Sequence, residues 1–108
     1  MININILGTN YSIHERTAKE DEYLETCDGY CDHTVKEIVC AKFIPGQGSL
    51  KDLDDYRRKV LRHELLHAFL FESGLGSNSD WATNEEMIDY FAYQIPKIAK
   101  AMQELNIL

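Results

Sequence analysis

Hydrophobic and polar residues alternate at the start of the chain with the two-residue period of a β-strand. In the run Ile-Asn-Ile-Asn-Ile, the side chains of Ile2, Ile4 and Ile6 would share one face and the asparagines the other. Strands are expected at residues 2–7, 11–14, 30–33 and 37–43. The pattern predicts a small antiparallel-type sheet in a β-rich N-terminal part, residues 1–44.

The second part of the chain changes to the spacing of amphipathic α-helices. Hydrophobic residues recur every three or four positions over residues 50–74, and glycines end the pattern. A second helix is expected over residues 83–108, where Thr83 and Glu86 fit an N-terminal capping box. Pro96 lacks the amide hydrogen that a helix interior needs, so a kink is expected there.

Together these elements predict an α+β fold in which the small sheet packs on two long C-terminal helices. A cluster of proline and glycine at residues 45–49 separates the two parts. The chain has 108 residues, which fits a single domain with one hydrophobic core. The second helix is expected to bury a face made of Ile88, Phe91, Ala92 and Ile95.

Composition and charge restrict the classes of partner. Hydrophobic residues make up 44% of the chain and charged residues 27%, which is typical of a folded globular protein. Lys and Arg number 11 against 18 Asp and Glu, and the net charge of −7 disfavours binding to nucleic acid or anionic lipid. No apolar run approaches the roughly 20 residues of a membrane-spanning helix. Neither nucleic acid nor a membrane is therefore an expected partner.

The N-terminus and the cysteines favour a cytoplasmic protein. The first residues lack the basic head and the long apolar core of a signal peptide. The chain has three cysteines, Cys27, Cys31 and Cys40, which cannot all pair with one another. Free thiols in a reducing compartment are the simplest interpretation.

The strongest chemical signal is the sequence His-Glu-Leu-Leu-His at residues 63–67, within the first expected helix. Residues four apart on a helix differ by about 40° around its axis, so His63 and His67 can reach one metal ion. Glu64 can face the remaining coordination position and take a proton from water as a general base. The pattern is rare by chance in a short chain, and it predicts a zinc site.

A catalytic zinc ion typically has three protein ligands, so a third must come from elsewhere, and the second helix offers candidates. Glu85 and Asp89 are four residues apart, which would let Glu85 bind the ion while Asp89 accepts a hydrogen bond from a ligating histidine. Glu86 is the competing ligand. The expected capping box favours Glu85, because Glu86 would bond back to the amide of Thr83.

Other candidate residues carry less weight. The usual ligand spacing of a Cys3His zinc site is absent from the set Cys27, Cys31, His33 and Cys40. A hydrolase often needs a second donor to the reacting oxygen, for which the sequence offers, without ranking them, His14, Tyr90 and Tyr93. Trp81 is expected to pack the loop between the helices as a hydrophobic anchor.

The chain resembles gluzincins, the thermolysin-type zinc metallopeptidases, through HELLH at residues 63–67 and NEEMID at residues 84–89. The stretch from Arg62 to Pro96 is also similar to the ImmA/IrrE-type metallopeptidases of phages and mobile elements. It departs from that second group, which usually has Asn at the position of Asp89 and Ala at the position of Ile88.

The resemblance implies a zincin-like metallopeptidase of minimal, minigluzincin-like size. The implied site has zinc on His63, His67 and Glu85, with Glu64 as general base and Asp89 beside a ligand. The implied reaction is zinc-dependent hydrolysis of a peptide bond by metal-activated water, with a protein or peptide as substrate.

The alternative function is a catalytically silent or latent zinc-binding regulatory module of phage or mobile-element origin. In some minimal gluzincins the chain's own terminus plugs the cleft, and here residues 101–108 would be such a plug. Loss of catalysis in that case would coexist with an intact metal site.

Overall fold

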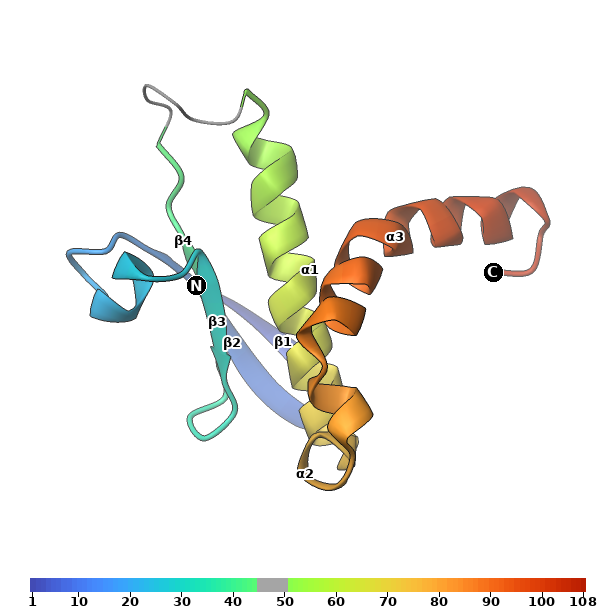
Figure 1. The fold of residues 1–108 in the computed structure, drawn as a ribbon, viewed down its shortest axis with the longest axis horizontal. Helices are drawn as coiled ribbons and strands as arrows, with labels where there is room; N and C mark the ends of the chain where they lie inside the picture. Colours follow the sequence, from blue (N-terminus) through green and yellow to red (C-terminus); the bar gives the residue numbers. More distant parts are fainter. Residues whose placement is uncertain (45–50) are drawn as a thin grey trace.

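A four-stranded sheet followed by helices makes up the structure, a computed structural model that describes residues 1–44 and 51–108 (Figure 1). The strands are β1 (Ile2–Ile6), β2 (Thr9–Arg16), β3 (Gly29–Asp32) and β4 (Glu37–Ala41). The helices are α1 (Leu53–Glu72), α2 (Leu75–Asn78) and α3 (Glu85–Glu104), with 3-10 helices η1 (Glu22–Glu25) and η2 (Asp80–Thr83). The proline and glycine cluster expected at 45–49 lies outside the described residues.

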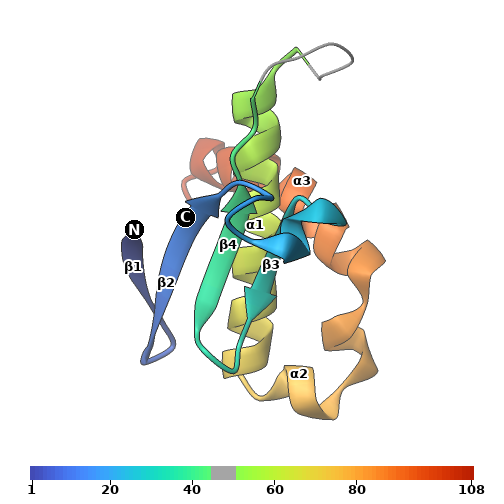
Figure 2. The same cartoon turned by 90° about the vertical axis from the view of Figure 1, so that its left-hand side faces the viewer.

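Helix α1 lies between the sheet and α3 (Figures 1 and 2). The main core fills the space between the sheet and α1, where the fully buried residues are Ile6, Tyr11, Ile38 and Ala68. This arrangement confirms the expected α+β fold, in which a small N-terminal sheet packs with long C-terminal helices.

The sheet is mixed, so the expectation of an antiparallel sheet is wrong. The strand order is β1-β2-β4-β3, and β2 pairs in parallel with β4 while the other two pairs are antiparallel. Strand β4 contains three successive fully buried residues, Ile38, Val39 and Cys40. A strand that is apolar on both faces is stable in the interior of a sheet. Strand β4 therefore lies between β2 and β3, and β3 becomes an edge strand.

Helix α1 is slightly shorter at both ends than the helix expected from the sequence. It begins after Asp52, whose Oδ1 accepts a hydrogen bond from the amide of Asp55 at 3.0 Å. The buried face of the helix carries Val60, Glu64 and Ala68, at four-residue spacing. A carboxyl group thus lies among the apolar side chains of the buried face.

Helix α3 is capped by Asn84, and the expected capping box at Thr83 is wrong. The Oδ1 atom of Asn84 accepts a hydrogen bond from the amide of Met87 at 2.8 Å. The hydroxyl of Thr83 instead donates to the carbonyl of Asp80 at 3.1 Å, within η2. Because the preceding turn uses Thr83, the helix begins two residues later than expected, at Glu85.

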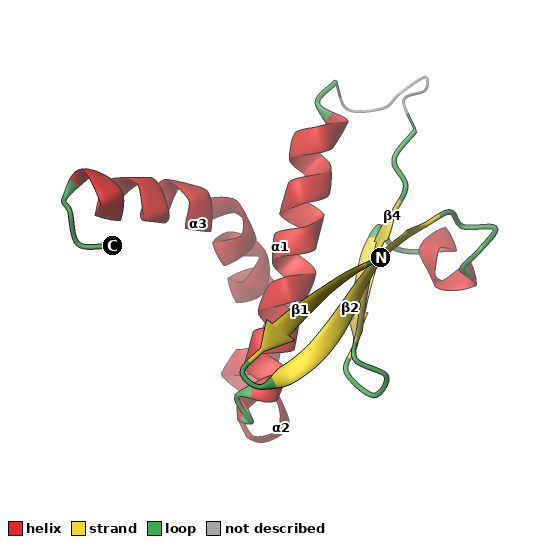
Figure 3. Cartoon of the chain, turned by 180° about the vertical axis from the view of Figure 1, so that it is seen from behind, coloured by secondary structure: helices red, strands yellow, loops and turns green. Residues whose placement is uncertain are grey.

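The second half of α3 projects from the body of the protein. Ile88 and Ala92 are fully buried and Phe91 is half-buried, whereas Ile95 is 36% exposed, so its expected burial is wrong. Figures 1 and 3 show that the helix bends about halfway along and then leaves α1 and the sheet. Pro96 lies inside this helix, where it removes one backbone hydrogen bond. No helix in the described part of the chain has the length and apolar character of a membrane span.

Strand β3 approaches α1 closely at Gly29. A Cβ atom at this position would lie 2.7 Å from Cγ1 of Val60 and 2.9 Å from the carbonyl oxygen of Val39. The same Cβ atom would lie 3.6 Å from Cγ of Glu64. Only glycine therefore allows the strand to cover this part of the helix without displacement.

The last residue of α1 ties the helix to the sheet through three hydrogen bonds. Glu72 accepts from the hydroxyls of Thr9 and Tyr11, at 2.9 and 2.6 Å, and from Nζ of Lys36 at 2.9 Å. These bonds lower the pKa of Glu72 to about 2, and the bond from Tyr11 has the largest effect. The ionised carboxylate therefore stabilises the contact between the end of α1 and the sheet.

We expect Gly29→Ala to destabilise the protein by about 1–3 kcal/mol, because the added methyl group overlaps Val60 and a backbone oxygen. Denaturant unfolding measures the loss. In a Val60→Ala background one of the two overlaps is removed, so the same substitution should cost at least about 0.5 kcal/mol less. Equal costs in both backgrounds would contradict the close approach.

We expect Glu72→Gln to destabilise the protein at neutral pH and to have a smaller effect as the pH falls. The pKa of Glu72 is lower in the folded protein than the value of about 4.3 for an unfolded chain. The stabilisation is therefore complete above the unfolded value and is lost as pH falls through the folded value. Unfolding free energies of both proteins, measured from about pH 7 to about pH 3, test this; a constant difference between them would contradict it.

Candidate metal centre

The two histidines of the sequence motif lie side by side on α1. The Nε2 atoms of His63 and His67 are 3.2 Å apart, as one turn of helix separates the two residues. Burial lowers the pKa of His67. Both rings thus aim the same nitrogen at one place, and burial favours the neutral form of the His67 imidazole, which is the metal-binding form.

Glu85 meets both histidines from the first turn of α3. Its Oε2 lies 2.9 Å from Nε2 of His63, and its Oε1 lies 2.9 Å from Nε2 of His67. The two helices are also joined by Arg62, whose Nε donates to the carbonyl of Ala92 at 2.6 Å. One donor atom from each of the three residues lies within 4.8 Å of the others. The structure therefore brings together the three residues expected as ligands.

Asp89 orients the ring of His63 from one turn further along α3. Its Oδ1 lies 3.1 Å from Nδ1 of His63. A hydrogen bond from Lys59 lowers the pKa of Asp89, and the bond from His63 adds to the effect. Since an ionised carboxylate can only accept, Asp89 favours the hydrogen on Nδ1 of His63, whereas the carboxylate of Glu85 competes for it at Nε2. With the hydrogen on Nδ1, the lone pair of Nε2 is available to a cation bound beside Glu85.

The donor set fits a zinc ion. Zinc–nitrogen bonds of about 2.0–2.1 Å place tetrahedral ligand atoms about 3.3 Å apart, and the separations here are 2.9–3.2 Å. Two imidazoles and one carboxylate are a known ligand set of catalytic zinc. The donors are Nε2 of His63, Nε2 of His67 and the carboxylate of Glu85. A cation bound between them would be attracted by the ring lone pairs and by the negative charge. Within residues 1–44 and 51–108, no other group of three His, Cys, Asp or Glu residues has donor atoms within 4.8 Å of one another. The alternative zinc site formed by three cysteines and His33 therefore gains no support.

Glu64 is a buried carboxyl group beside these donors. Only 8% of the surface of Glu64 is exposed to solvent. Burial raises its pKa to about 7; the charges of His63 and Lys59 oppose this rise, and that of Glu85 adds to it. A carboxyl group that titrates near neutral pH can both take and return a proton.

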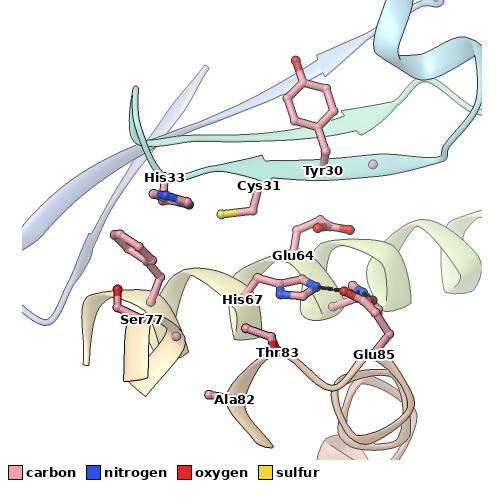
Figure 4. A pocket seen from close by; sticks show the side chains of 13 residues that line it. Tyr30, Cys31, His33, Glu64, His67, Ser77, Ala82, Thr83 and Glu85 are labelled. Carbon is pink, nitrogen blue, oxygen red and sulfur yellow. Dashed lines mark hydrogen bonds and ion pairs between the residues drawn. The ribbon is translucent and has the colours of Figure 1, made fainter. Parts of the chain in front are cut away.

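The donors and Glu64 open into a cavity of about 610 Å³. Its walls come from β3 on one side and from α1, the α2 region, η2 and the start of α3 on the other (Figure 4). Cys31 and His33 project from the strand side toward the helix, whereas the ring of Tyr30 points away from it. Strand β3 lies at the edge of the sheet, so the cavity runs along a strand with unpaired backbone groups.

Sequence reasoning missed the wall of this cavity. His33 stacks on Phe71, with ring centroids 3.7 Å apart and an interplanar angle of 22°. Phe71 follows His67 by one turn of α1, and both residues line the cavity. The period of two places Gly29, Cys31 and His33 on one side of the strand, and this alternation is the signal that could have identified the wall.

The remaining candidates lie outside the cavity. His14 is on β2, and the aromatic side chains of Tyr90 and Tyr93 are exposed on α3. Trp81 is 55% exposed, so it does not act as a buried anchor of the loop. None of these four residues lines the cavity, and neither do residues 101–108. The expected plug by the tail is therefore not present in this structure.

Comparison of the chain with protein-family models, with curated proteins and with solved structures finds no match. A function for this chain is therefore inferred from the geometry of the site. That geometry combines three converging donor atoms with a buried carboxyl group in one open cavity.

We expect the protein to bind one zinc ion per chain, measured by chelator competition and elemental analysis. Loss of an outer hydrogen-bonding partner typically weakens metal binding by about 10- to 100-fold. His67→Ala and Glu85→Gln remove direct donors, so each should weaken binding by more than that. Glu86→Gln is the matched control, because Glu86 does not line the cavity. Equal losses for Glu85→Gln and Glu86→Gln would contradict the assignment of the third ligand.

Proposed function

We propose that the protein is a zinc-dependent peptidase of the gluzincin type. The observation that supports this most is the convergence of His63, His67 and Glu85 on one point beside the buried carboxyl of Glu64. Zinc held there would polarise the carbonyl of a peptide bond and make water a stronger nucleophile. The residues of the chain would bind the ion and handle the proton.

Glu64 is the proposed general base and acid. It takes a proton from the attacking water, whose oxygen joins the carbonyl carbon of the peptide bond. When the bond between carbon and nitrogen breaks, Glu64 returns the proton to the leaving amine. A pKa of about 7 suits both transfers, because the group is neither strongly acidic nor strongly basic at neutral pH.

The proposed substrate is an extended segment of a protein or peptide. Strand β3 is an edge strand and borders the cavity, so a substrate strand can pair with its backbone. Such pairing holds the peptide bond by main-chain hydrogen bonds, while side chains alternate into the cavity and away from it. This mode requires an unfolded or flexible segment of the substrate.

The proposed compartment is the cytoplasm. The three cysteines, Cys27, Cys31 and Cys40, are all free thiols. Burial raises the pKa of Cys40 to about 12, so this thiol is protonated and unreactive at neutral pH. A reducing environment is compatible with such cysteines.

We expect Glu64→Gln to retain zinc and to lose peptidase activity by about a hundredfold to ten-thousandfold, because the amide cannot take a proton. A library of fluorogenic peptides measures activity, and elemental analysis measures zinc. Glu86→Gln, which removes a carboxylate outside the cavity, serves as the control and should keep full activity. Cleavage that survives Glu64→Gln would refute the mechanism, and zinc binding without any cleavage by the wild type would favour the regulatory module.

A further inference from the structure

The ammonium group of Lys59 is held beside the candidate metal centre by three neighbours. Its side chain is only 14% exposed, and its Nζ lies 2.5 Å from Oδ1 of Asp89. The same Nζ lies 4.7 Å from the ring centroid of Tyr93 and 6.0 Å from that of Tyr56. Aromatic faces attract a cation at such distances. The position of this charge is therefore determined from several sides.

Lys59 and His63 share one oxygen of Asp89. Nδ1 of His63 lies 3.1 Å from the same Oδ1 atom that accepts from Lys59. The two donors are four residues apart on α1, so they present to α3 from one face of the helix. On α3, Asp89 in turn lies one turn after Glu85. Lys59 therefore belongs to the chain of contacts that ends at the converging donor atoms.

Asp89 needs an additional partner to keep its orientation. Its side chain is 41% exposed, so water competes with the imidazole for the carboxylate oxygens. A neutral imidazole can carry its hydrogen on either nitrogen, and Asp89 beside Nδ1 competes for it with Glu85 beside Nε2. If the carboxylate turned to solvent, Nε2 of His63 could carry the hydrogen and would then lack a lone pair for a metal ion.

We propose that Lys59 is a positioning residue of the metal centre. By holding Oδ1 of Asp89 against Nδ1 of His63, it fixes the tautomer and the ring orientation that expose the Nε2 lone pair. The role in metal affinity rests on the proposed zinc site, whereas the effect on the tautomer does not require the ion.

Zinc affinity gives the first test. Lys59→Met keeps most of the aliphatic side chain and removes the charge, and it should weaken zinc binding by about tenfold or more. Lys59→Arg keeps the charge and should restore affinity to within about threefold of the wild type. The matched control is Arg62→Met, which removes another cationic link between α1 and α3 without contacting Asp89. Equal losses for the methionine variants would show that the lysine only joins the helices and would overturn the proposal.

The tautomer of His63 gives the second test. In the metal-free, 15N-labelled Glu85→Ala protein at about pH 8, where no carboxylate faces Nε2, nitrogen chemical shifts should place the hydrogen of His63 on Nδ1. When Lys59→Met is added to this variant the shifts should move toward the other tautomer, and when Lys59→Arg or Arg62→Met is added they should not. An unchanged tautomer in Lys59→Met, together with unchanged zinc affinity, would overturn the proposal.

The two tests separate the failure of this inference from that of the proposed function. If the wild type binds no zinc while the tautomer responds to Lys59→Met, the peptidase proposal fails and the positioning role stands. If the wild type binds zinc and neither measurement responds to Lys59→Met, the positioning role fails and the peptidase proposal is unaffected.

Discussion

The packing of α3 against α1 is the interaction on which the rest of the site depends. His63 and His67 come from one helix and Glu85 from the other, so no local interaction can assemble the three donors. The imidazoles and the carboxylate lie about 3 Å apart, and they can bond to one another or share a cation only once the two helices are packed. The buried side chains of Ile88 and Ala92 therefore have to hold the helices together. An isoleucine buried to this extent contributes about 1.5–3 kcal/mol to this packing.

The burial of Glu64 connects the chemistry of the site to the core of the fold. This residue lies on the same face of α1 as Val60 and Ala68, and the close approach of β3 at Gly29 helps to exclude water from it. Loss of hydration is the main cause of its raised pKa. The same burial disfavours the charged carboxylate, so the fold gives up some stability at neutral pH for a group that can exchange protons.

The order of strands determines which part of the sheet remains accessible. Strand β4 takes a central place because both of its faces are apolar, and this leaves β3 at the edge, along the cavity. Had the strands followed one another as a simple antiparallel meander, β3 would have been paired on both sides. The insertion of β4 therefore creates the open strand that the proposed substrate would use.

Local patterns in the sequence were sufficient for the four strands, the two long helices and the histidine pair. The period of a helix places His63 and His67 on one side whatever the rest of the chain does, and the α+β class followed from the two periods. The tertiary structure alone decided the mixed strand order, the stacking of His33 on Phe71 and the meeting of Glu85 with the histidines. Asn84, and not the expected Thr83, caps α3, so the position of Glu85 at the histidines follows from the packing of the helices. Periodicity depends on neighbouring residues, whereas strand order and helix contacts depend on burial summed over residues far apart in the chain, which no local pattern records.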